Sequence, residues 1–107
     1  MLRFWIDDVR PAPADYWIWI KSVNEAKKAI MRYEFQMQKG PILLSLDHDA
    51  GDYAKDGGDY IKLLDWLEEN RFPNEDYYFH IHSKNPVGAN NMRAILYHNG
   101  WQEVKGI

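Results

Sequence analysis

The sequence predicts a layered α/β domain built around a mainly parallel sheet. Short apolar runs typical of buried strands alternate along the chain with segments whose apolar residues recur at helical spacing. Two of these runs, residues 2–6 and 42–46, are followed at once by acidic residues. Because the carboxyl ends of parallel strands meet at one edge of a sheet, we expect a ligand site at that edge.

Two strands are predicted in the first twenty residues. Leu2–Ile6 has the composition of a buried strand, and the prolines at positions 11 and 13 end it, because each removes a backbone donor and fixes φ. Residues 16–20 alternate tryptophan with isoleucine, which predicts an edge strand with two differently packed faces. The connection between the two strands is too short for a crossover helix, so the direction of the second strand stays open.

A helix and a central strand are predicted next. Ser22 and Glu25 form a capping-box pattern, and apolar residues then recur at helical spacing as far as Met37. Gly40 and the following proline end this helix. Residues 42–46 are apolar at nearly every position, as expected for a strand that is covered on both faces.

Two helices and two strands are predicted in the second half. Leucines at helical spacing indicate a helix that Asp59 caps and residues 70–73 end. The remaining elements are a strand, a helix and a short strand, at residues 77–82, 90–97 and 101–104. Gly100 ends the last helix, because glycine adopts the left-handed conformation common at helix C-termini.

The composition fits one folded domain over residues 1–107, with 46% hydrophobic and 15% aromatic residues to form a core. The absence of cysteine excludes a disulfide framework and a thiolate nucleophile. A net charge of -3 argues against an extended nucleic-acid duplex as partner, since such contacts need a basic face. No apolar run approaches the roughly 20 residues of a membrane span, and the first residues lack signal-peptide features. We therefore expect a soluble, cytoplasmic protein whose partner is a small phosphorylated ligand.

Acidic residues follow two of the predicted strands. Asp7 and Asp8 come after the first strand, and Asp47 and Asp49 come after the central one. A single acid pair at a strand end is more often solvated or caps a turn than binds a ligand. Two such groups on neighbouring strands can surround one hard cation. The four aspartates therefore predict a divalent metal site, with Mg²⁺ or Mn²⁺ as the expected ion.

His80 and His82 lie two residues apart in a predicted strand, so they face the same side of the sheet if the strand includes both. A lone strand histidine is usually a core residue that bonds to the backbone. A pair followed by a serine, a lysine and a glycine turn favours a functional role instead. The two imidazoles could supply a general base and a general acid, or bind a transition metal as neutral rings. Because the aspartates already provide a cation site, proton transfer is the preferred role.

The turn after the histidines contains groups that bind anions: a hydroxyl, an ammonium group, an amide and free backbone N–H groups. The alternative is an ordinary Asn-Pro turn with a glycine. Phosphate or substrate contacts are assigned to Arg10, His48, Ser83, Lys84, Asn85 and Gly88. Arg10 could instead neutralise the first acid pair. Aromatic residues at strand and helix spacing are assigned to the core rather than to the site: Trp17, Trp19, Tyr53 and Trp66.

Three segments together resemble the cyclic-phosphate processing receiver domain family: Trp5-Ile6-Asp7-Asp8-Val9-Arg10-Pro11, Ser45-Leu46-Asp47-His48-Asp49 and His80-Ile81-His82-Ser83-Lys84-Asn85-Pro86-Val87-Gly88. The resemblance spans almost the whole chain. It implies a three-layer, flavodoxin- and receiver-like fold with a mainly parallel five-stranded sheet. The chain lacks the first and last receiver helices, surfaces that receivers use to engage partners.

In receivers, acids after the first strand bind Mg²⁺, an aspartate after the third accepts a phosphoryl group, and a hydroxyl after the fourth contacts that group. The matching positions here are Asp7, Asp8, Asp47 and Ser83. A receiver lysine after the fifth strand is matched poorly by Lys105, which lacks the proline that usually follows it. This departure counts against ordinary phosphoacceptor signalling.

The leading functional hypothesis is a metal-dependent phosphoesterase that opens a cyclic phosphate on a nucleotide or an RNA end. Its catalytic residues would be His80, His82, Asp47 and Ser83, and its metal ligands Asp7, Asp8, Asp47 and Asp49. The alternative is a non-catalytic receiver-like module that binds a cyclic nucleotide or a protein partner. A third hypothesis retains phosphorylation of Asp47.

Overall fold

The computed structural model describes residues 1–35, 40–70 and 76–106. Its sheet has the order β2-β1-β3-β4-β5, and every neighbouring pair of strands is parallel. The strands are β1 (Leu2–Ile6), β2 (Ile18–Ile20), β3 (Ile42–Leu46), β4 (Tyr77–Ile81) and β5 (Gln102–Glu103). The predicted α/β fold with a five-stranded sheet is confirmed. The second strand, whose direction the sequence left open, is a parallel edge strand beside β1.

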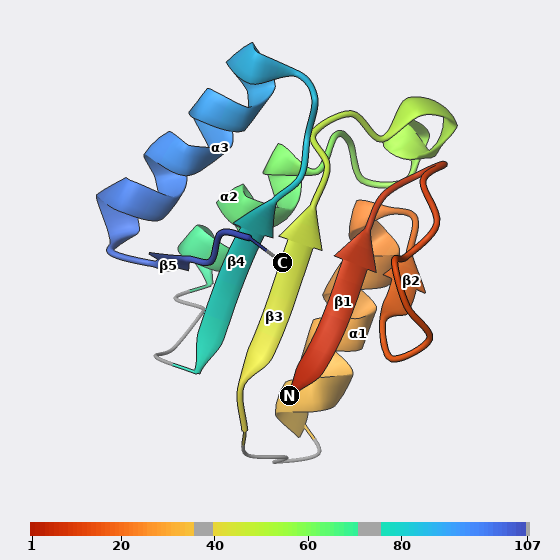
Figure 1. Ribbon diagram of the computed structural model, residues 1–107, viewed down its shortest axis with the longest axis vertical. Coiled ribbons are helices and arrows are strands. Elements are labelled where there is room, and N and C mark those ends of the chain that lie inside the picture. The colour runs from red at the N-terminus through yellow and green to blue at the C-terminus, as the bar shows by residue number, and fades with distance from the viewer. Residues whose placement is uncertain (36–39, 71–75, 107) are drawn as a thin grey trace.

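The three α-helices share one face of the sheet. They are α1 (Val23–Phe35), α2 (Ile61–Glu69) and α3 (Pro86–Asn99), and a short 3₁₀ helix, η1, covers Gly51–Lys55. The connections from β2 to β3, from β3 to β4 and from β4 to β5 all cross the sheet in the same direction. Right-handed crossovers then place each connecting helix on the same face. Figure 1 shows α1 and α2 behind the sheet, with α3 beside α2.

The main core lies between this face and the helices. Apolar side chains from four strands meet side chains from all three helices, among them Ile6, Leu44, Phe79, Ile30, Leu64 and Met92. Every residue of β3 is buried, which confirms the prediction that residues 42–46 form the central strand. Within the described residues, no helix is long and apolar enough to span a membrane.

The other face of the sheet, which we call the helix-free face, carries a second apolar cluster. Trp5, Trp17 and Leu43 are buried there, packed against Ala12 and other small or aromatic neighbours. The rings of Trp5 and Trp17 meet edge to face, with centroids 5.5 Å apart. The indole N–H of Trp5 also donates to the backbone oxygen of Arg10 over 2.9 Å. The predicted third layer is therefore formed by the chain between β1 and β2 rather than by helices.

Two of the predicted helix starts differ from the structure. Ser22 caps α1 as predicted, since its Oγ accepts the Glu25 N–H at 3.0 Å. The prediction that Asp59 caps α2 is wrong: the capping position is Tyr60, and the Asp59 carboxylate instead accepts the N–H of Ala50 over 2.9 Å. The Asp59 side chain therefore closes the loop after β3 and does not cap the helix.

The third helix begins at Pro86, one turn before the predicted start at residue 90. The side chain of Asn85 accepts the Gly88 N–H over 3.1 Å, and proline suits the first helical position because its missing donor would have no partner there. Gly100, with φ of 68°, ends the helix as predicted. The predicted helical position Met37 and residues 71–73 of the predicted stop lie outside the described residues.

Candidate functional site

Three polar side chains stand side by side at the carboxyl ends of β1, β3 and β4. The ladder of backbone hydrogen bonds continues one residue past each strand. There the N–H groups of Asp7, Asp47 and His82 donate to the neighbouring strand over 3.1, 2.9 and 2.9 Å. This continuation fixes the three residues at the same step of adjacent strands. The predicted meeting of acids and imidazoles at one edge of the sheet is therefore seen in the structure.

A second row lies two residues earlier along each strand. Trp5 is in register with Ser45, and Ser45 is in register with His80. Because side chains two residues apart in a strand share a face, this row and the first one both occupy the helix-free face. The rings of His80 and His82 have centroids 6.2 Å apart. The two imidazoles therefore lie on the same side of the sheet.

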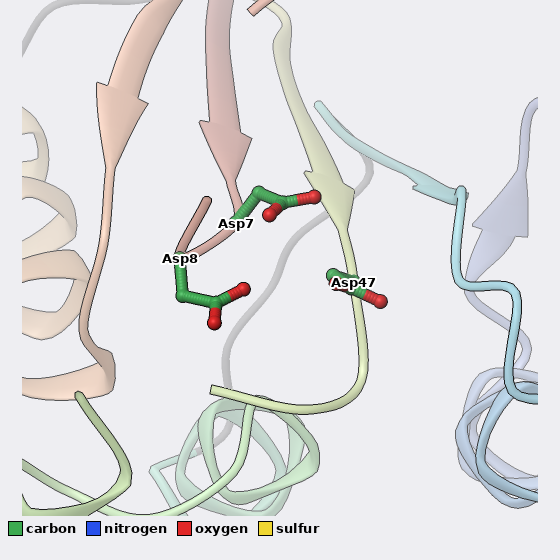
Figure 2. A group of neighbouring side chains, drawn as sticks. All are labelled: Asp7, Asp8 and Asp47. Atoms are coloured by element: carbon green, nitrogen blue, oxygen red, sulfur yellow. The ribbon is translucent and has the colours of Figure 1, made fainter. Parts of the chain in front are cut away.

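An acid cluster forms where the first row meets the loop after β1. Asp7, Asp8 and Asp47 each offer a carboxylate oxygen within 4.8 Å of the others (Figure 2). Burial, followed by the charges of Asp7 and Asp47, raises the pKa of the Asp8 carboxyl. A bound cation would offset this repulsion. Three convergent carboxylates suit a hard divalent ion such as Mg²⁺ or Mn²⁺, which prefers oxygen ligands.

Asp7 is the buried member of the cluster and holds several elements together. Its Oδ1 accepts the N–H groups of Val9 and Arg10 over 3.1 and 2.9 Å, and its Oδ2 lies 2.9 Å from Nε2 of His82. Its backbone oxygen accepts the indole N–H of Trp19 over 2.8 Å. Burial raises the pKa of Asp7, but the hydrogen bonds from Arg10, His82 and Val9 outweigh burial and lower it overall. Asp7 is thus an anion that fixes the turn after β1.

Asp8 and Asp47 are less enclosed. Both side chains are partly exposed, and Oδ1 of Asp47 accepts the N–H of His48 over 2.8 Å. Their remaining carboxylate oxygens are the ones best placed to bind an ion from solvent. If the cluster held a metal ion, Asp8 and Asp47 would therefore be the first of the three to contact it.

Gly51 makes room for Asp8. It adopts φ of 54°, and a Cβ built on it would lie 2.3 Å from Oδ2 of Asp8. Gly51→Ala should therefore push the Asp8 carboxylate out of the cluster and weaken Mn²⁺ binding by about tenfold or more. Isothermal titration calorimetry with Mn²⁺ measures this effect.

Gly100→Ala is the matched control for the Gly51 variant. Gly100 has a similar φ of 68°, but a Cβ there would meet no heavy atom within 4 Å. Both variants carry the strain of a left-handed alanine, about 1–2 kcal/mol, and only one displaces Asp8. Equal Mn²⁺ affinity in the two variants would contradict the assignment of Asp8 to the metal site.

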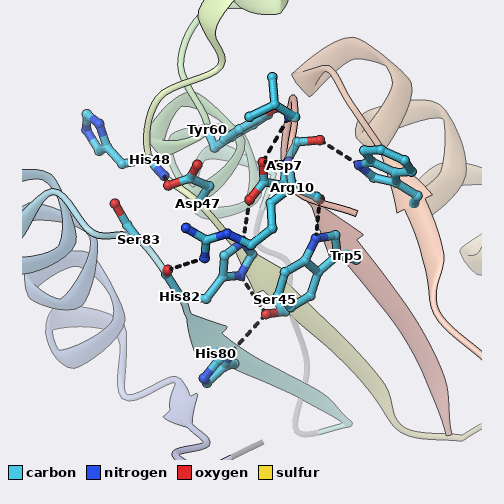
Figure 3. A network of polar contacts seen from close by, with 12 residues as sticks. Trp5, Asp7, Arg10, Ser45, Asp47, His48, Tyr60, His80, His82 and Ser83 are labelled. Atoms are coloured by element: carbon cyan, nitrogen blue, oxygen red, sulfur yellow. Dashed lines mark hydrogen bonds and ion pairs between the residues drawn. The ribbon is translucent and has the colours of Figure 1, made fainter. Parts of the chain in front are cut away.

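His82 lies between Asp7 and Ser45 (Figure 3). Its side chain is only 6% exposed, and its ring stacks on that of Trp5 with centroids 3.8 Å apart and planes at 4°. Nε2 faces Asp7, and Nδ1 lies 2.8 Å from Oγ of Ser45. Burial lowers the pKa of His82, and the bond to Asp7 opposes this effect. Both ring nitrogens of His82 are therefore engaged by protein groups.

His80 is the more accessible imidazole. It is half-buried, and its Nδ1 lies 2.8 Å from the same Oγ of Ser45. Within the described part of the chain, Nε2 of His80 has no hydrogen-bond partner. Burial, followed by the charge of His82, lowers the pKa of His80, while Glu103 opposes this. His80 is therefore a neutral ring near neutral pH, with one nitrogen available.

Two predicted phosphate contacts lie beside this network. A guanidinium N–H of Arg10 donates to the backbone oxygen of His82 over 3.3 Å, which leaves its other donors available. Ser83 follows His82, and its Oγ accepts the N–H of Asn85 over 3.1 Å. The hydroxyl proton of Ser83 therefore remains free to donate. Both side chains are partly exposed at the edge where the acid cluster lies.

The other predicted site residues lie further from the acid cluster. Nδ1 of His48 pairs with the exposed carboxylate of Asp49 over 2.9 Å, and Asp49 is not part of the three-aspartate group. The His48 ring packs on Gly88, where a Cβ would lie 2.4 Å from it. The N–H of Gly88 is used by the cap of α3, so it is not the free donor that the sequence predicted. Lys84 is exposed in the turn before α3.

Sequence reasoning missed two residues of the network, Ser45 and Trp5. The sequence places Ser45 in an apolar strand and Trp5 in the first strand, and both belong to the segments that resemble the family, but neither is assigned a role in the site. A serine that is fully buried in an otherwise apolar strand must find a partner for its hydroxyl, and it lies two residues before Asp47. That spacing was the signal that could have placed it on the same face as the site.

A family model described as the cyclic-phosphate processing receiver domain matches residues 2–98. The chain belongs to this family. Neither the curated proteins nor the solved structures contain a significant match to it. The chain is thus a receiver-like domain associated with cyclic-phosphate processing.

Receivers have a helix between their first two strands, and this member of the cyclic-phosphate processing receiver family lacks it. The order of the strands shows which face of the sheet that helix would cover. The step from β1 to β2 runs across the sheet opposite to the other steps. A right-handed crossover helix there would lie on the helix-free face. The short connection that stands in its place instead packs Ala12, Ala14 and Trp17 against Trp5 and Leu43. Lys105 lies after β5, where its charge helps to lower the pKa of Glu103.

Proposed function

We propose that this domain is a metal-dependent phosphoesterase that opens a cyclic phosphate on a nucleotide or an RNA end. One observation carries the proposal: Asp7, Asp47 and His82 form one row at the strand ends, His80 lies in the next row of the same face, and hydrogen bonds through Ser45 and Asp7 join the imidazoles to the acid cluster. A cation site and a proton-transfer group side by side can both contribute to hydrolysis of a phosphodiester. Membership in a cyclic-phosphate processing family points to the class of substrate.

Asp8 and Asp47 would hold the metal, with Asp7 completing the cluster from its buried position. When bound, a divalent ion offsets the negative charge that develops on the phosphate oxygens. Because Asp7 is fixed by the turn after β1 and by His82, the cluster is held in place before substrate arrives. Such preorganisation is what allows fixed charges to accelerate a reaction.

The phosphate would lie at the strand ends, where Arg10, Ser83 and Lys84 provide donors. Arg10 has a planar guanidinium suited to two phosphate oxygens at once. Two residues of a strand span about 6–7 Å, so the ribose of a cyclic nucleotide bound at the acid cluster would reach down the helix-free face toward His80. The same arrangement accommodates the terminal ribose of an RNA.

His80 is the proposed proton-transfer residue. In ring opening, the oxygen of water forms a bond to phosphorus, and one ester P–O bond of the ring breaks. Nε2 of His80 would accept the proton of the attacking water, and the leaving ribose oxygen on the opposite side of the phosphorus would take a proton from solvent, so the product is a phosphomonoester. His82 is assigned to holding Asp7 rather than to substrate, because its side chain is 6% exposed. Ser83 would donate its hydroxyl proton in a hydrogen bond to the phosphate and would take no part in proton transfer.

The pH dependence of turnover tests the role of His80. Burial lowers the pKa of His80, and a general base must be unprotonated to act. Turnover should therefore rise as the pH rises through the pKa of His80 in the folded protein, with a midpoint below the ordinary histidine value of about 6.5. Initial rates measured at saturating Mn²⁺ between pH 4.5 and 8 give the midpoint.

His80→Ala is the control for the pH profile, because carboxylates of the metal site also titrate in acid. In this variant kcat should fall by about 10²- to 10⁴-fold. The rise of turnover with pH that reflects deprotonation of His80 should also disappear. If the rise of turnover with pH had the same midpoint in wild type and in His80→Ala, it would reflect titration of the aspartates and would contradict the role of His80.

A second candidate is a module that binds an intact cyclic nucleotide without hydrolysis. The burial of His82 favours it, since one of the two predicted proton-transfer groups cannot touch a ligand. In this case the acid cluster and Arg10 would serve binding alone.

A substrate panel separates the two candidates. Cyclic mononucleotides with 2′,3′ and 3′,5′ rings, cyclic oligonucleotides and RNA with a terminal cyclic phosphate are incubated with Mg²⁺, Mn²⁺, Zn²⁺ or a chelator and analysed by chromatography. We expect a metal-dependent phosphomonoester from at least one class. Tight binding of an intact ring by calorimetry without any product would support the binding module instead.

A further inference from the structure

One serine hydroxyl connects the two imidazoles. Oγ of Ser45 lies 2.8 Å from Nδ1 of His80 and 2.8 Å from Nδ1 of His82 (Figure 3). Ser45 is fully buried in the central strand. A hydroxyl has one proton, so it can donate to only one of these nitrogens and must accept from the other. The direction of this chain of hydrogen bonds therefore decides which nitrogens of both rings carry protons.

Asp7 sets that direction. Its carboxylate is acceptor-only when ionised, and Nε2 of His82 lies 2.9 Å from it, so Nε2 carries the proton. In a neutral His82 ring, Nδ1 is then unprotonated and accepts the hydroxyl proton of Ser45. The oxygen of Ser45 accepts in turn from Nδ1 of His80. Nε2 of His80 is left with a lone pair, and it is the nitrogen that has no partner in the described residues.

We propose that Ser45 is a positioning residue whose single hydroxyl proton fixes the tautomers of both imidazoles, so that His80 presents an unprotonated Nε2 to the helix-free face. The register supports a fixed geometry, because Ser45 in the fully buried strand β3 and His80 in β4 are partners in a parallel pair of strands. Trp5 stacks on His82 and limits rotation of that ring. The catalytic consequence, a base held ready at His80, rests on the proposed function, whereas the tautomers do not.

Long-range ¹H–¹⁵N spectra of the histidine rings test the proposal without turnover. In wild type at pH 7.5, His80 should show a protonated Nδ1 and an unprotonated Nε2, and His82 the reverse. In Ser45→Ala, His80 should become a mixture of tautomers while His82 keeps its proton on Nε2, because Asp7 remains. Ser45→Thr, which restores a hydroxyl, should restore the wild-type pattern of His80.

Tyr78→Phe is the matched control, since it removes a hydroxyl from the same face, one row below Ser45, and should leave both rings unchanged. An unprotonated Nδ1 on His80 in wild type, or an unaltered His80 in Ser45→Ala, would overturn the proposal.

Kinetics on a hydrolysed substrate then test the catalytic consequence. Ser45→Ala should lower kcat by about 10- to 100-fold with little change in KM, and Ser45→Thr should recover most of the loss. If Ser45→Ala had mixed His80 tautomers but the kcat of wild type, the positioning role of Ser45 would be overturned. The proposed hydrolysis would not be affected by that result. An absence of turnover in wild type would refute the proposed function and leave the spectra to decide the tautomers.

Discussion

Asp47→Asn is expected to remove Mn²⁺-dependent ring opening, with a fall in turnover of roughly 10³-fold or more. Asp47 contributes one of three carboxylates that approach within 4.8 Å, and it is partly exposed at the end of the central strand. Asparagine keeps the shape and the acceptor for the His48 N–H, so the fold is retained and only the negative charge is lost. Steady-state rates and Mn²⁺ calorimetry on the same sample measure both effects.

Asp49→Asn is the control for this substitution. Asp49 lies two residues further along, carries the same charge, and belongs to an exposed pair with His48 outside the three-aspartate group. Its loss should change Mn²⁺ affinity and turnover by less than about twofold, a change of less than 0.5 kcal/mol. Equal effects of the two substitutions would contradict the composition of the metal site and restore the four-aspartate site that the sequence predicted.

Trp5→Ala is expected to lower the free energy of unfolding by about 3–5 kcal/mol, which is a large fraction of the stability of a small domain. Trp5 is 6% exposed on the helix-free face, where no helix compensates for its removal. The substitution opens a cavity beside Trp17 and deprives His82 of its stacking partner. Urea unfolding followed by far-ultraviolet circular dichroism measures the loss.

Trp5→Phe serves as the comparison, since it keeps an aromatic ring against His82 but loses the N–H bond to the Arg10 backbone. It should cost clearly less than Trp5→Ala. A loss below about 1 kcal/mol in Trp5→Ala would mean that the helix-free face contributes little to stability. The loop between β1 and β2 could then not be regarded as a substitute for a helical layer.

The elements of the sheet were predictable because their signals are local. Apolar runs bounded by glycine, proline or acids located four of the five strands closely, and residues 42–46 were identified as the central strand because all are apolar except Ser45. Convergence of Asp7 and Asp47 followed from the parallel arrangement alone. The start of α3 was missed because Pro86 and Asn85 resemble a turn, although both are also favourable at a helix start.

The arrangement on the helix-free face was not predictable from local patterns. Which face the helices cover depends on the order of strands and the handedness of crossovers, and neither is visible in periodicity. The burial of His82 depends on contact with Trp5, which is distant in sequence. The role of Ser45 could not be predicted for the same reason, because its two partners, His80 and His82, are distant in sequence. The types of residue in the site were therefore predictable, but the hydrogen bonds that hold these residues in place were not.

Oxygen-18 labelling tests the central claim most directly. A substrate identified by the panel is incubated with the protein and Mn²⁺ in H₂¹⁸O, and the product is examined by ³¹P NMR. We predict one ¹⁸O atom bound to phosphorus in the ring-opened monoester, and none above background with Asp47→Asn. An unopened ring across the whole panel of substrates and metals, with the protein folded, would contradict the account.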